Sequence, residues 1–194
     1  YRVKTITYRK DPILTCSNTG IPMDEGVVSL SITGASSVKR FLRSQGFPVV
    51  DVYGPPQGSG FVVIVSVSRN EPSLAEKIKN SLISRRYETS KLILVDDDID
   101  VFDLSQVIHA ISTKCHPGRG IFIDHVFTAN PLTPYLSHQE RMEGKSSMAV
   151  LDCTWPSDWS RETDIPPRVS FNEVYPEEIK DKVLQNWKNY GFKQ

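Results

Sequence analysis

The stretch LILVDDDIDVFDLSQ, residues 92–106, decides the fold because it joins a strand to a helix through a run of aspartates. KLILV at 91–95 is a short apolar run rich in branched residues, which is typical of a buried strand. A helix is expected at about 104–114, where apolar residues recur three or four positions apart. A buried strand followed at once by a helix predicts an α/β arrangement of helices packed on a sheet.

Asp103 is predicted to cap this helix. It lies one residue before the helix, and Gln106 follows three positions later. The Asp-x-x-Gln spacing is of the capping-box kind, which satisfies backbone amides that have no partner inside the first turn. We therefore assign Asp103 a structural role.

The remaining aspartates of the run have two interpretations. The D-x-D-x-D spacing at 96–100 is similar to a calcium loop, but that loop needs Gly and Glu where this chain has Val101 and Val107. Carboxylates at the carboxyl end of a parallel strand can instead face a ligand crevice. A solvated, hydrogen-bonded turn is the favoured alternative, because no histidine or second acidic cluster is close in sequence. These roles stay open for Asp96, Asp97, Asp98 and Asp100.

Strands and helices alternate through the first half of the chain. Strands are expected at 3–9, 49–54, 61–67 and 121–126, and helices at 72–84 and over the later part of 27–45. The order strand, helix, strand, helix, strand implies right-handed crossovers. The sequence thus predicts an α/β domain over residues 1–126, with a mostly parallel or mixed sheet flanked by helices.

The segment after residue 126 has a different character. Residues 127–194 are polar and broken by prolines, and we expect an extended segment that wraps over another surface to satisfy its backbone groups. It contains one strand candidate, MAVLDCTW at 148–155, and ends in an amphipathic helix at 175–191. Docking of this helix on its own domain and a contact with another subunit both remain open.

Charge, hydropathy and cysteine usage exclude several classes of partner. Lys and Arg together number 23, as do Asp and Glu, so no global field attracts nucleic acid or an anionic membrane. No apolar run approaches the roughly 20 residues of a membrane helix. The widely spaced Cys16, Cys115 and Cys153 favour free thiols in the cytoplasm. Because the chain starts with Tyr1, we expect it to be a piece of a longer protein.

The sequence contains no complete active site. His116 and His125 lack the spacing of a triad or a metal site, and Cys115 beside His116 does not by itself make a nucleophile and base pair. His109, on a mostly apolar helix, is expected in a core or an interface. No nucleotide-binding glycine motif or hydrolase motif is present, and no metal site is predicted.

Four ordered blocks carry a resemblance to a known family. They are LILVDDDIDVFDLSQVIHAISTKCHPG from residue 92, NPLTPYLSH from 130, LDCTWPSDW from 151 and YPEEIKDKVLQNWKNYGF from 175. In this order they resemble the C-terminal part of UbiD-like decarboxylases, which include ferulic acid and protocatechuate (hydroxybenzoate) decarboxylases. The resemblance begins at RKDPIL, residues 9–14. The block from 151, with DIPPRVSF, looks closer to the hydroxybenzoate type.

The resemblance implies reversible, nonoxidative loss of carbon dioxide from an aromatic or unsaturated acid on prenylated FMN, the cofactor that acts as an electron sink. In this family the cofactor, its Mn and K ions and the catalytic residues belong to a flavin-binding N-terminal domain, which is absent from this chain. We therefore expect no catalytic residue, no bound cofactor and no activity in the chain alone. The resemblance also implies a homodimer or hexamer formed through this domain.

The resemblance suggests roles for a few individual residues. Leu132 matches a leucine over the substrate pocket, and Asn130 stands where ferulic acid decarboxylases have phenylalanine, consistent with a more polar substrate. Arg85 or Arg86 would replace a lysine near the cofactor. His138 is a candidate proton relay, although an exposed loop histidine is the favoured interpretation. The alternative interpretation of Leu132 is that it is an ordinary core residue.

Two functional hypotheses follow from the sequence. In the first, the chain caps the active site and mediates self-association in a decarboxylase of this family. In the second, it is an autonomous α/β binding or scaffold module without catalytic activity. The ordered family blocks favour the first hypothesis.

Overall fold

The computed structural model describes residues 1–194 except 15, 17–19, 69–70, 86–88, 127–129, 131 and 194, with the backbone alone for 126, 172 and 173. Contacts within the chain divide it into two compact units, Tyr1–Thr154 and Trp155–Gln194. None of the helices in the described residues is both long and apolar enough to cross a bilayer.

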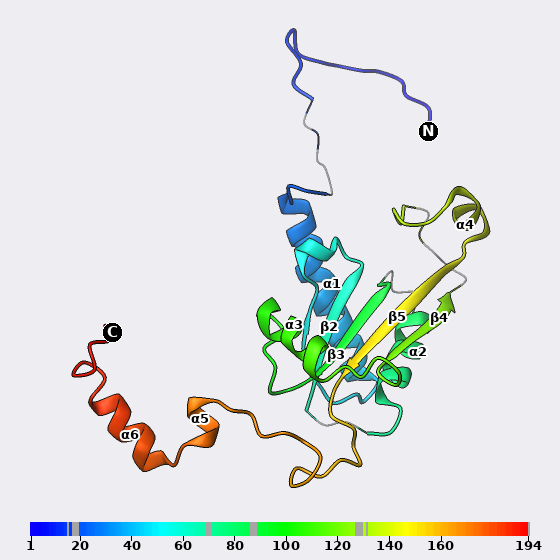
Figure 1. Ribbon diagram of the computed structural model, residues 1–194. Coiled ribbons are helices and arrows are strands. Elements are labelled where there is room, and N and C mark those ends of the chain that lie inside the picture. Colours follow the sequence, from blue (N-terminus) through cyan, green and yellow to red (C-terminus); the bar gives the residue numbers. More distant parts are fainter. Residues whose placement is uncertain are drawn as a thin grey trace. The chain divides into compact units, whose positions relative to one another are not determined.

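The first unit alternates helices and strands (Figure 1). In chain order its elements are α1 (Glu25–Ser44), β1 (Val49–Tyr53), the short 3-10 helix η1 (Pro56–Gly58), β2 (Val62–Val67), α2 (Leu74–Ser84), β3 (Lys91–Asp96), α3 (Leu104–Thr113), β4 (Ile121–Val126), α4 (His138–Glu143) and β5 (Ser146–Cys153). The second unit contains α5 (Phe171–Val174) and α6 (Glu177–Gln185). The α/β class predicted from the sequence is confirmed.

The strands form one mixed, five-stranded sheet in the order β1-β2-β3-β5-β4. β2 pairs with β3, and β3 with β5, in parallel, whereas β1 and β4 run antiparallel to their neighbours. The strand predicted at 148–155 is present as β5, and it lies between β3 and β4. The expected parallel relation between the strands at 91–95 and 121–126 is therefore wrong, because β5 is parallel to β3 and β4 is antiparallel to β5, although α3 does connect β3 to β4.

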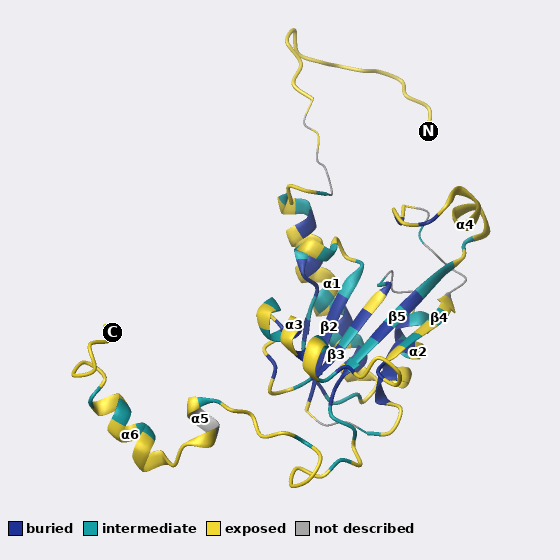
Figure 2. Ribbon diagram, viewed as in Figure 1, coloured by how far each residue is buried: buried dark blue, intermediate teal, exposed yellow. Residues whose placement is uncertain are grey.

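Helices cover the two faces of the sheet differently. α1 and α2 pack on one face, where Leu42, Ile78 and Leu82 join the main core with alternate residues of the strands. α3 packs on the other face through Val107 and Ala110. Figure 2 shows buried residues concentrated in the strands between these helices. The period-two alternation of strand side chains thus supplies two separate apolar layers.

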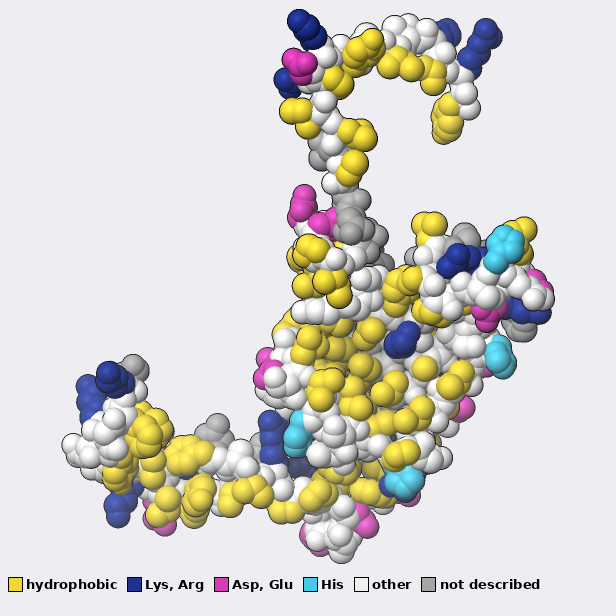
Figure 3. Space-filling view, turned by 45° about the horizontal axis from the view of Figure 1, so that its top comes forward, with side chains coloured by type: hydrophobic (Ala, Val, Ile, Leu, Met, Phe, Trp, Pro, Cys, Tyr) yellow, Lys and Arg dark blue, Asp and Glu magenta, His cyan; other side chains and the backbone are white. Residues whose placement is uncertain are grey.

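The α3 face of the sheet is only partly covered. On β4, Ile121 and Ile123 point away from α1 and α2 and are 44 % and 68 % exposed. The space-filling view shows a broad hydrophobic area with few charged side chains on the first unit (Figure 3). An area of this kind normally marks a contact surface.

Two expectations for the N-terminal region need correction. Residues 3–9 were predicted as a strand, but they form no strand and are exposed. Alternating residues form a strand only where a neighbouring strand pairs with them and an apolar layer packs against their apolar side. The helix expected over the later part of 27–45 instead begins at Glu25. Asp24 caps it, its Oδ1 accepting from N of Val27 at 2.9 Å, and this cap overrides the strand-like pattern at the front.

The second unit contains all three tryptophans of the chain. Trp155 stacks on Trp159 with ring centres 5.7 Å apart, and Trp187 stacks on Phe192 at 4.4 Å. The predicted terminal helix is present as α6, followed by turns up to Gly191. None of the residues of α6 is buried within this chain, so the partner of its apolar stripe remains a prediction.

Candidate functional site

Strand direction sorts the candidate residues onto two edges of the sheet. β2, β3 and β5 run parallel, so they begin together at one edge, called here the amino edge, and end together at the opposite one, the carboxyl edge. Because β4 runs antiparallel to β5, its end lies at the amino edge. The segment after β4 therefore reaches the same edge as the start of β3.

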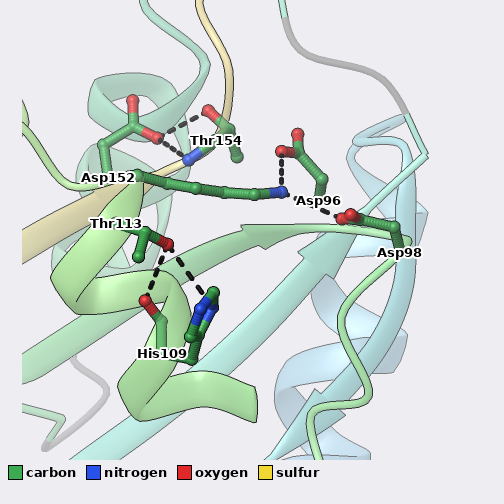
Figure 4. Close-up of polar contacts among 7 residues, drawn as sticks. Asp96, Asp98, His109, Thr113, Asp152 and Thr154 are labelled. Carbon is green, nitrogen blue, oxygen red and sulfur yellow. Dashed lines mark hydrogen bonds and ion pairs between the residues drawn. The ribbon is translucent and has the colours of Figure 1, made fainter. Parts of the chain in front are cut away.

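The carboxyl edge holds an ion-paired cluster. Nζ of Lys114 lies 2.9 Å from Oδ2 of Asp96 and 3.0 Å from Oδ1 of Asp98, and both carboxylates face this amino group in Figure 4. The Lys114 side chain is only 8 % exposed, and a buried ammonium is tolerated where anionic partners offset its desolvation. The two ion pairs therefore connect the end of β3 and the turn that follows it to the C-terminal end of α3.

Asp103 caps α3, which confirms the sequence prediction. Its Oδ1 accepts from N of Ser105 at 2.9 Å, and this bond, helped by the Gln106 side chain, lowers the pKa of Asp103. The Gln106 side chain donates to Asp103 but accepts from N of Asp100 at 3.2 Å. The reciprocal bond of a capping box thus goes to Asp100 instead of the amide of Asp103.

Polar and sulfur groups at the end of β5 also have structural partners. Oδ1 of Asp152 accepts from N and Oγ1 of Thr154 at 3.1 and 2.6 Å (Figure 4). Cys115 and Cys153 are buried nearby, and burial raises the pKa of both thiols, so both stay protonated and poorly nucleophilic. Across the described ranges, no three or more His, Cys, Asp or Glu side chains gather as metal ligands.

The histidines lie apart on the surface. His109 is exposed on α3, with Nδ1 3.5 Å from Oγ1 of Thr113. Of the two positions expected for it, the core is therefore wrong within this chain and the interface remains a prediction. Nδ1 of His125 lies 3.3 Å from Oγ of Ser147, and His138 is exposed at the start of α4.

Residues 130 and 132–137, called here the Leu132 loop, include the two residues matched to the substrate pocket. Oδ1 of Asn130 accepts from N of Leu132 at 2.8 Å, and the carbonyl of Asn130 accepts from N of Thr133 at 3.0 Å. Asn130 therefore shapes the turn that carries Leu132. The Leu132 side chain is 83 % exposed, so within this chain it is not a core residue.

The Leu132 loop is anchored on its inner side. Thr133 and Leu136 are buried, and Arg141 of α4 donates to the carbonyls of Thr133 and Pro134 at 3.4 and 3.3 Å. The capping box at Ser137 fixes the start of α4. An exposed apolar tip on an anchored loop is suited to contact a ligand or another surface.

Sequence reasoning missed the side chains that support this loop from the sheet. Nζ of Lys91, at the start of β3, lies 4.8 Å from the centre of the Tyr135 ring. Phe61 approaches the same ring edge-on at 6.2 Å, and the Tyr135 hydroxyl lies 3.5 Å from Oγ of Ser146. No spacing pattern in the sequence signals this cluster, because its members come from distant segments.

Of the two predicted cofactor arginines, the structure describes only Arg85. Arg85 ends α2 and is exposed, with its guanidinium carbon 6.0 Å from the centre of the Phe41 ring on α1. Arg86 lies outside the described residues. A cofactor role for either arginine remains a prediction.

This fold, with its anchored loop at the amino edge, is that of a known domain class. The family described as 3-octaprenyl-4-hydroxybenzoate carboxy-lyase C-terminal domain matches residues 28–153. The chain belongs to this family, as the resemblance in the sequence indicated.

Two curated relatives are decarboxylases. Ferulic acid decarboxylase 1 of Saccharomyces cerevisiae is 28 % identical over 204 residues, which cover 100 % of this chain and 40 % of the yeast protein. Pyrrole-2-carboxylic acid decarboxylase of Pseudomonas aeruginosa is 24 % identical over 202 residues, which cover 99 % of this chain and 40 % of that protein. The chain thus spans two fifths of the length of these relatives.

Solved structures of the same class share the fold. The UbiD-class enzyme HmfF of Pelotomaculum thermopropionicum, in complex with FMN, matches with a TM-score of 0.65 and 25 % identity over 76 % of this chain and 32 % of its own. Vanillic acid decarboxylase of Sedimentibacter hydroxybenzoicus in its open form matches with a TM-score of 0.63 and 25 % identity over 88 % of this chain and 36 % of its own.

Proposed function

We propose that this chain is the active-site-capping and oligomerisation domain of a decarboxylase for an aromatic acid, in particular a hydroxylated benzoic acid. The match of residues 28–153 to a carboxy-lyase domain family carries the proposal. Both curated relatives are decarboxylases, and a structural neighbour acts on vanillic acid, a hydroxylated benzoic acid. The substrate class rests on that neighbour and on the hydroxybenzoate-like blocks of the sequence.

The proposed cofactor is prenylated FMN with Mn and K in the full-length enzyme, and the FMN bound to HmfF supports a flavin. When bound, such a cofactor supplies an electron sink for the carbanion left by carbon dioxide. The described residues of this chain form no cluster that fits a metal ion. The resemblance assigns the cofactor and the catalytic residues to the flavin-binding N-terminal domain, so in this proposal the contribution of the present chain is to shape and close the substrate pocket.

Leu132 is the residue through which the chain would touch the substrate. Its side chain projects from an anchored loop and is exposed within this chain. The aromatic ring of a substrate bound by the rest of the enzyme would pack against it. Asn130 would set the orientation of this leucine, because its Oδ1 is already occupied by N of Leu132. Closing the pocket in this way excludes water from the reacting acid.

Self-association is the second part of the proposal. Ile179 and Leu184 of α6, together with Ile123 of β4, are apolar and substantially exposed, which is expected of surfaces that are covered in a homodimer or hexamer. The balanced charge and the free cysteines support a cytoplasmic protein.

The decisive experiment is a substrate screen with the full-length protein, produced in cells that supply prenylated FMN. We expect loss of carbon dioxide to be fastest from hydroxylated benzoic acids and slower from ferulic and pyrrole-2-carboxylic acids, with products followed by liquid chromatography. A flavin-loaded protein that decarboxylates none of these acids would contradict the proposal and favour a binding module. Faster turnover of ferulic acid than of the hydroxylated benzoic acids would refute the proposed substrate class and leave the decarboxylase function standing.

A further inference from the structure

One cationic and two aromatic side chains form a cluster that links the Leu132 loop to the sheet. We call Lys91, Tyr135 and Phe61 the Lys91 clamp. The ammonium of Lys91 lies 4.8 Å from the centre of the Tyr135 ring, and the Phe61 ring meets Tyr135 edge-on at 6.2 Å. A cation over a ring face and an edge-to-face aromatic pair are both attractive arrangements. Tyr135 is therefore held from two sides.

The sheet fixes the two members of the clamp that do not belong to the loop. The carbonyl of Phe61 accepts from N of Ser90 and N of Lys91 at 3.1 and 3.0 Å, and from Oγ of Ser90 at 3.2 Å. Nζ of Lys91 also donates to Oγ of Ser90 at 3.2 Å. Phe61 and Lys91 thus form a rigid platform where β2 and β3 begin.

Tyr135 is coupled to Leu132 through a short and constrained stretch. Thr133 is buried between them, and its amide is bonded to the carbonyl of Asn130. The carbonyls of Thr133 and Pro134 accept from the same Arg141 guanidinium. Because these bonds restrict the backbone between the two residues, we expect loss of the contacts of Tyr135 to loosen the backbone that carries Leu132.

We propose that Lys91 and Tyr135 are positioning residues for the aromatic acid, acting through Leu132. This inference rests on the proposed function and adds to it the side chains that set the pocket wall. In this proposal the clamp acts through Leu132 and does not itself touch the substrate. It holds Leu132 in the position that the closed pocket requires, and displacement of a pocket residue by about 1 Å weakens substrate positioning.

Substitutions can test the contribution of the Lys91 cation separately from that of the Tyr135 ring. Lys91→Met removes the charge and retains much of the stem, whereas Lys91→Arg keeps a cation able to lie over the ring. Tyr135→Ala removes the ring, and Tyr135→Phe removes only the hydroxyl. Lys79→Met is the matched control, because Lys79 also lies over a ring, that of Phe122 at 5.7 Å, on the opposite face of the sheet.

The first measurement is amide hydrogen–deuterium exchange of the full-length protein in peptides that contain residues 132–136. We expect faster exchange in Lys91→Met and Tyr135→Ala, wild-type exchange in Lys91→Arg and Tyr135→Phe, and no change at this loop in Lys79→Met. This readout does not depend on turnover. Unchanged exchange in both Lys91→Met and Tyr135→Ala would overturn the inference.

The second measurement is steady-state decarboxylation of the preferred acid by the same variants. We expect KM to rise about threefold in Lys91→Met and about tenfold in Tyr135→Ala, with kcat changing much less, and KM to recover in Lys91→Arg. In combination with Leu132→Ala, Tyr135→Ala should add little further effect, because both act on the same contact.

The outcomes separate the inference from the function on which it rests. Faster loop exchange with an unchanged KM, or fully additive effects with Leu132→Ala, would refute the positioning role and leave the clamp as a structural feature. A wild-type protein that turns over no aromatic acid would contradict the proposed function. In that case the exchange data alone would decide whether the clamp holds the loop.

Discussion

Leu132 combines an exposed side chain with a constrained backbone. Its amide is bonded to Asn130, and the next residue, Thr133, is buried. A leucine held in this way contributes little to the core, because its side chain remains in contact with water within this chain. It can contribute to binding, because the loop does not have to be ordered when the ligand arrives.

Leu132→Ala is therefore expected to change catalysis and leave folding nearly unchanged. In the full-length enzyme kcat/KM for the aromatic acid should fall about tenfold, the size expected when a pocket loses a few apolar carbons. The free energy of unfolding should change by less than about 0.5 kcal/mol. Steady-state kinetics and urea unfolding measure the two effects.

Leu30→Ala is the control for this substitution, since Leu30 of α1 is also an exposed leucine of the same unit. It should not change kcat/KM. A large loss of stability in Leu132→Ala with unaltered kinetics would instead assign Leu132 to a buried structural contact in the full-length protein.

At the scale of elements, one ion pair ties α2 to the edge strand β4. Nζ of Lys79 lies 2.8 Å from Oδ2 of Asp124, and the Lys79 side chain is 8 % exposed whereas that of Asp124 is 47 % exposed. The hydrogen bond and charge of Lys79 lower the pKa of Asp124 below its ordinary value of 3.8. The pair therefore favours the folded state while Asp124 is ionised.

Asp124→Asn should destabilise the protein in a pH-dependent way. Because the pKa of Asp124 is lowered by folding, its contribution is fully present above 3.8 and is lost as the pH falls through the lower folded value. The variant should be less stable than wild type near about pH 7, and the difference should shrink as the pH falls below 3.8. Urea unfolding at a series of pH values from neutral to acid tests this.

Lys79→Met provides the background for a control, because it removes the partner of Asp124. In that background Asp124→Asn should cause no pH-dependent loss of stability. A difference between wild type and Asp124→Asn that stays the same from neutral to acid pH would contradict the assigned ion-pair role.

At the scale of the whole molecule, the five strands and the two tryptophan stacks belong to different units. The sheet lies entirely within Tyr1–Thr154, and Trp155, Trp159 and Trp187 all lie in Trp155–Gln194. Far-ultraviolet circular dichroism therefore reports mainly on the first unit, whereas tryptophan fluorescence reports on the second. The two probes can be compared within a single chain.

We expect the two probes to give different unfolding curves for the 194-residue chain. Tryptophan fluorescence should change at lower urea concentration than the dichroism signal, because none of the residues of α6 is buried and the described residues of the second unit form no strand. Coincident transitions would show that the two units unfold as one cooperative body.

Much of the fold was predictable from local patterns. The run at 91–106 correctly predicted β3, α3 and the Asp103 cap, because a buried apolar strand and a capped amphipathic helix are specified by neighbouring residues. The terminal helix was predicted for the same reason. The position of β5 was not, since strand order depends on which edges meet and no local pattern encodes it.

The sequence by itself determined the α/β class, most helices and strands, and the family to which the chain belongs, because these depend on periodicity, caps and ordered motifs. Only the tertiary structure decided the partners of charged and aromatic groups. Lys114 meets Asp96, and Lys91 meets Tyr135, across long separations along the chain. Such contacts form when packing of the sheet brings distant segments together, and only then do the anchors of the Leu132 loop become visible.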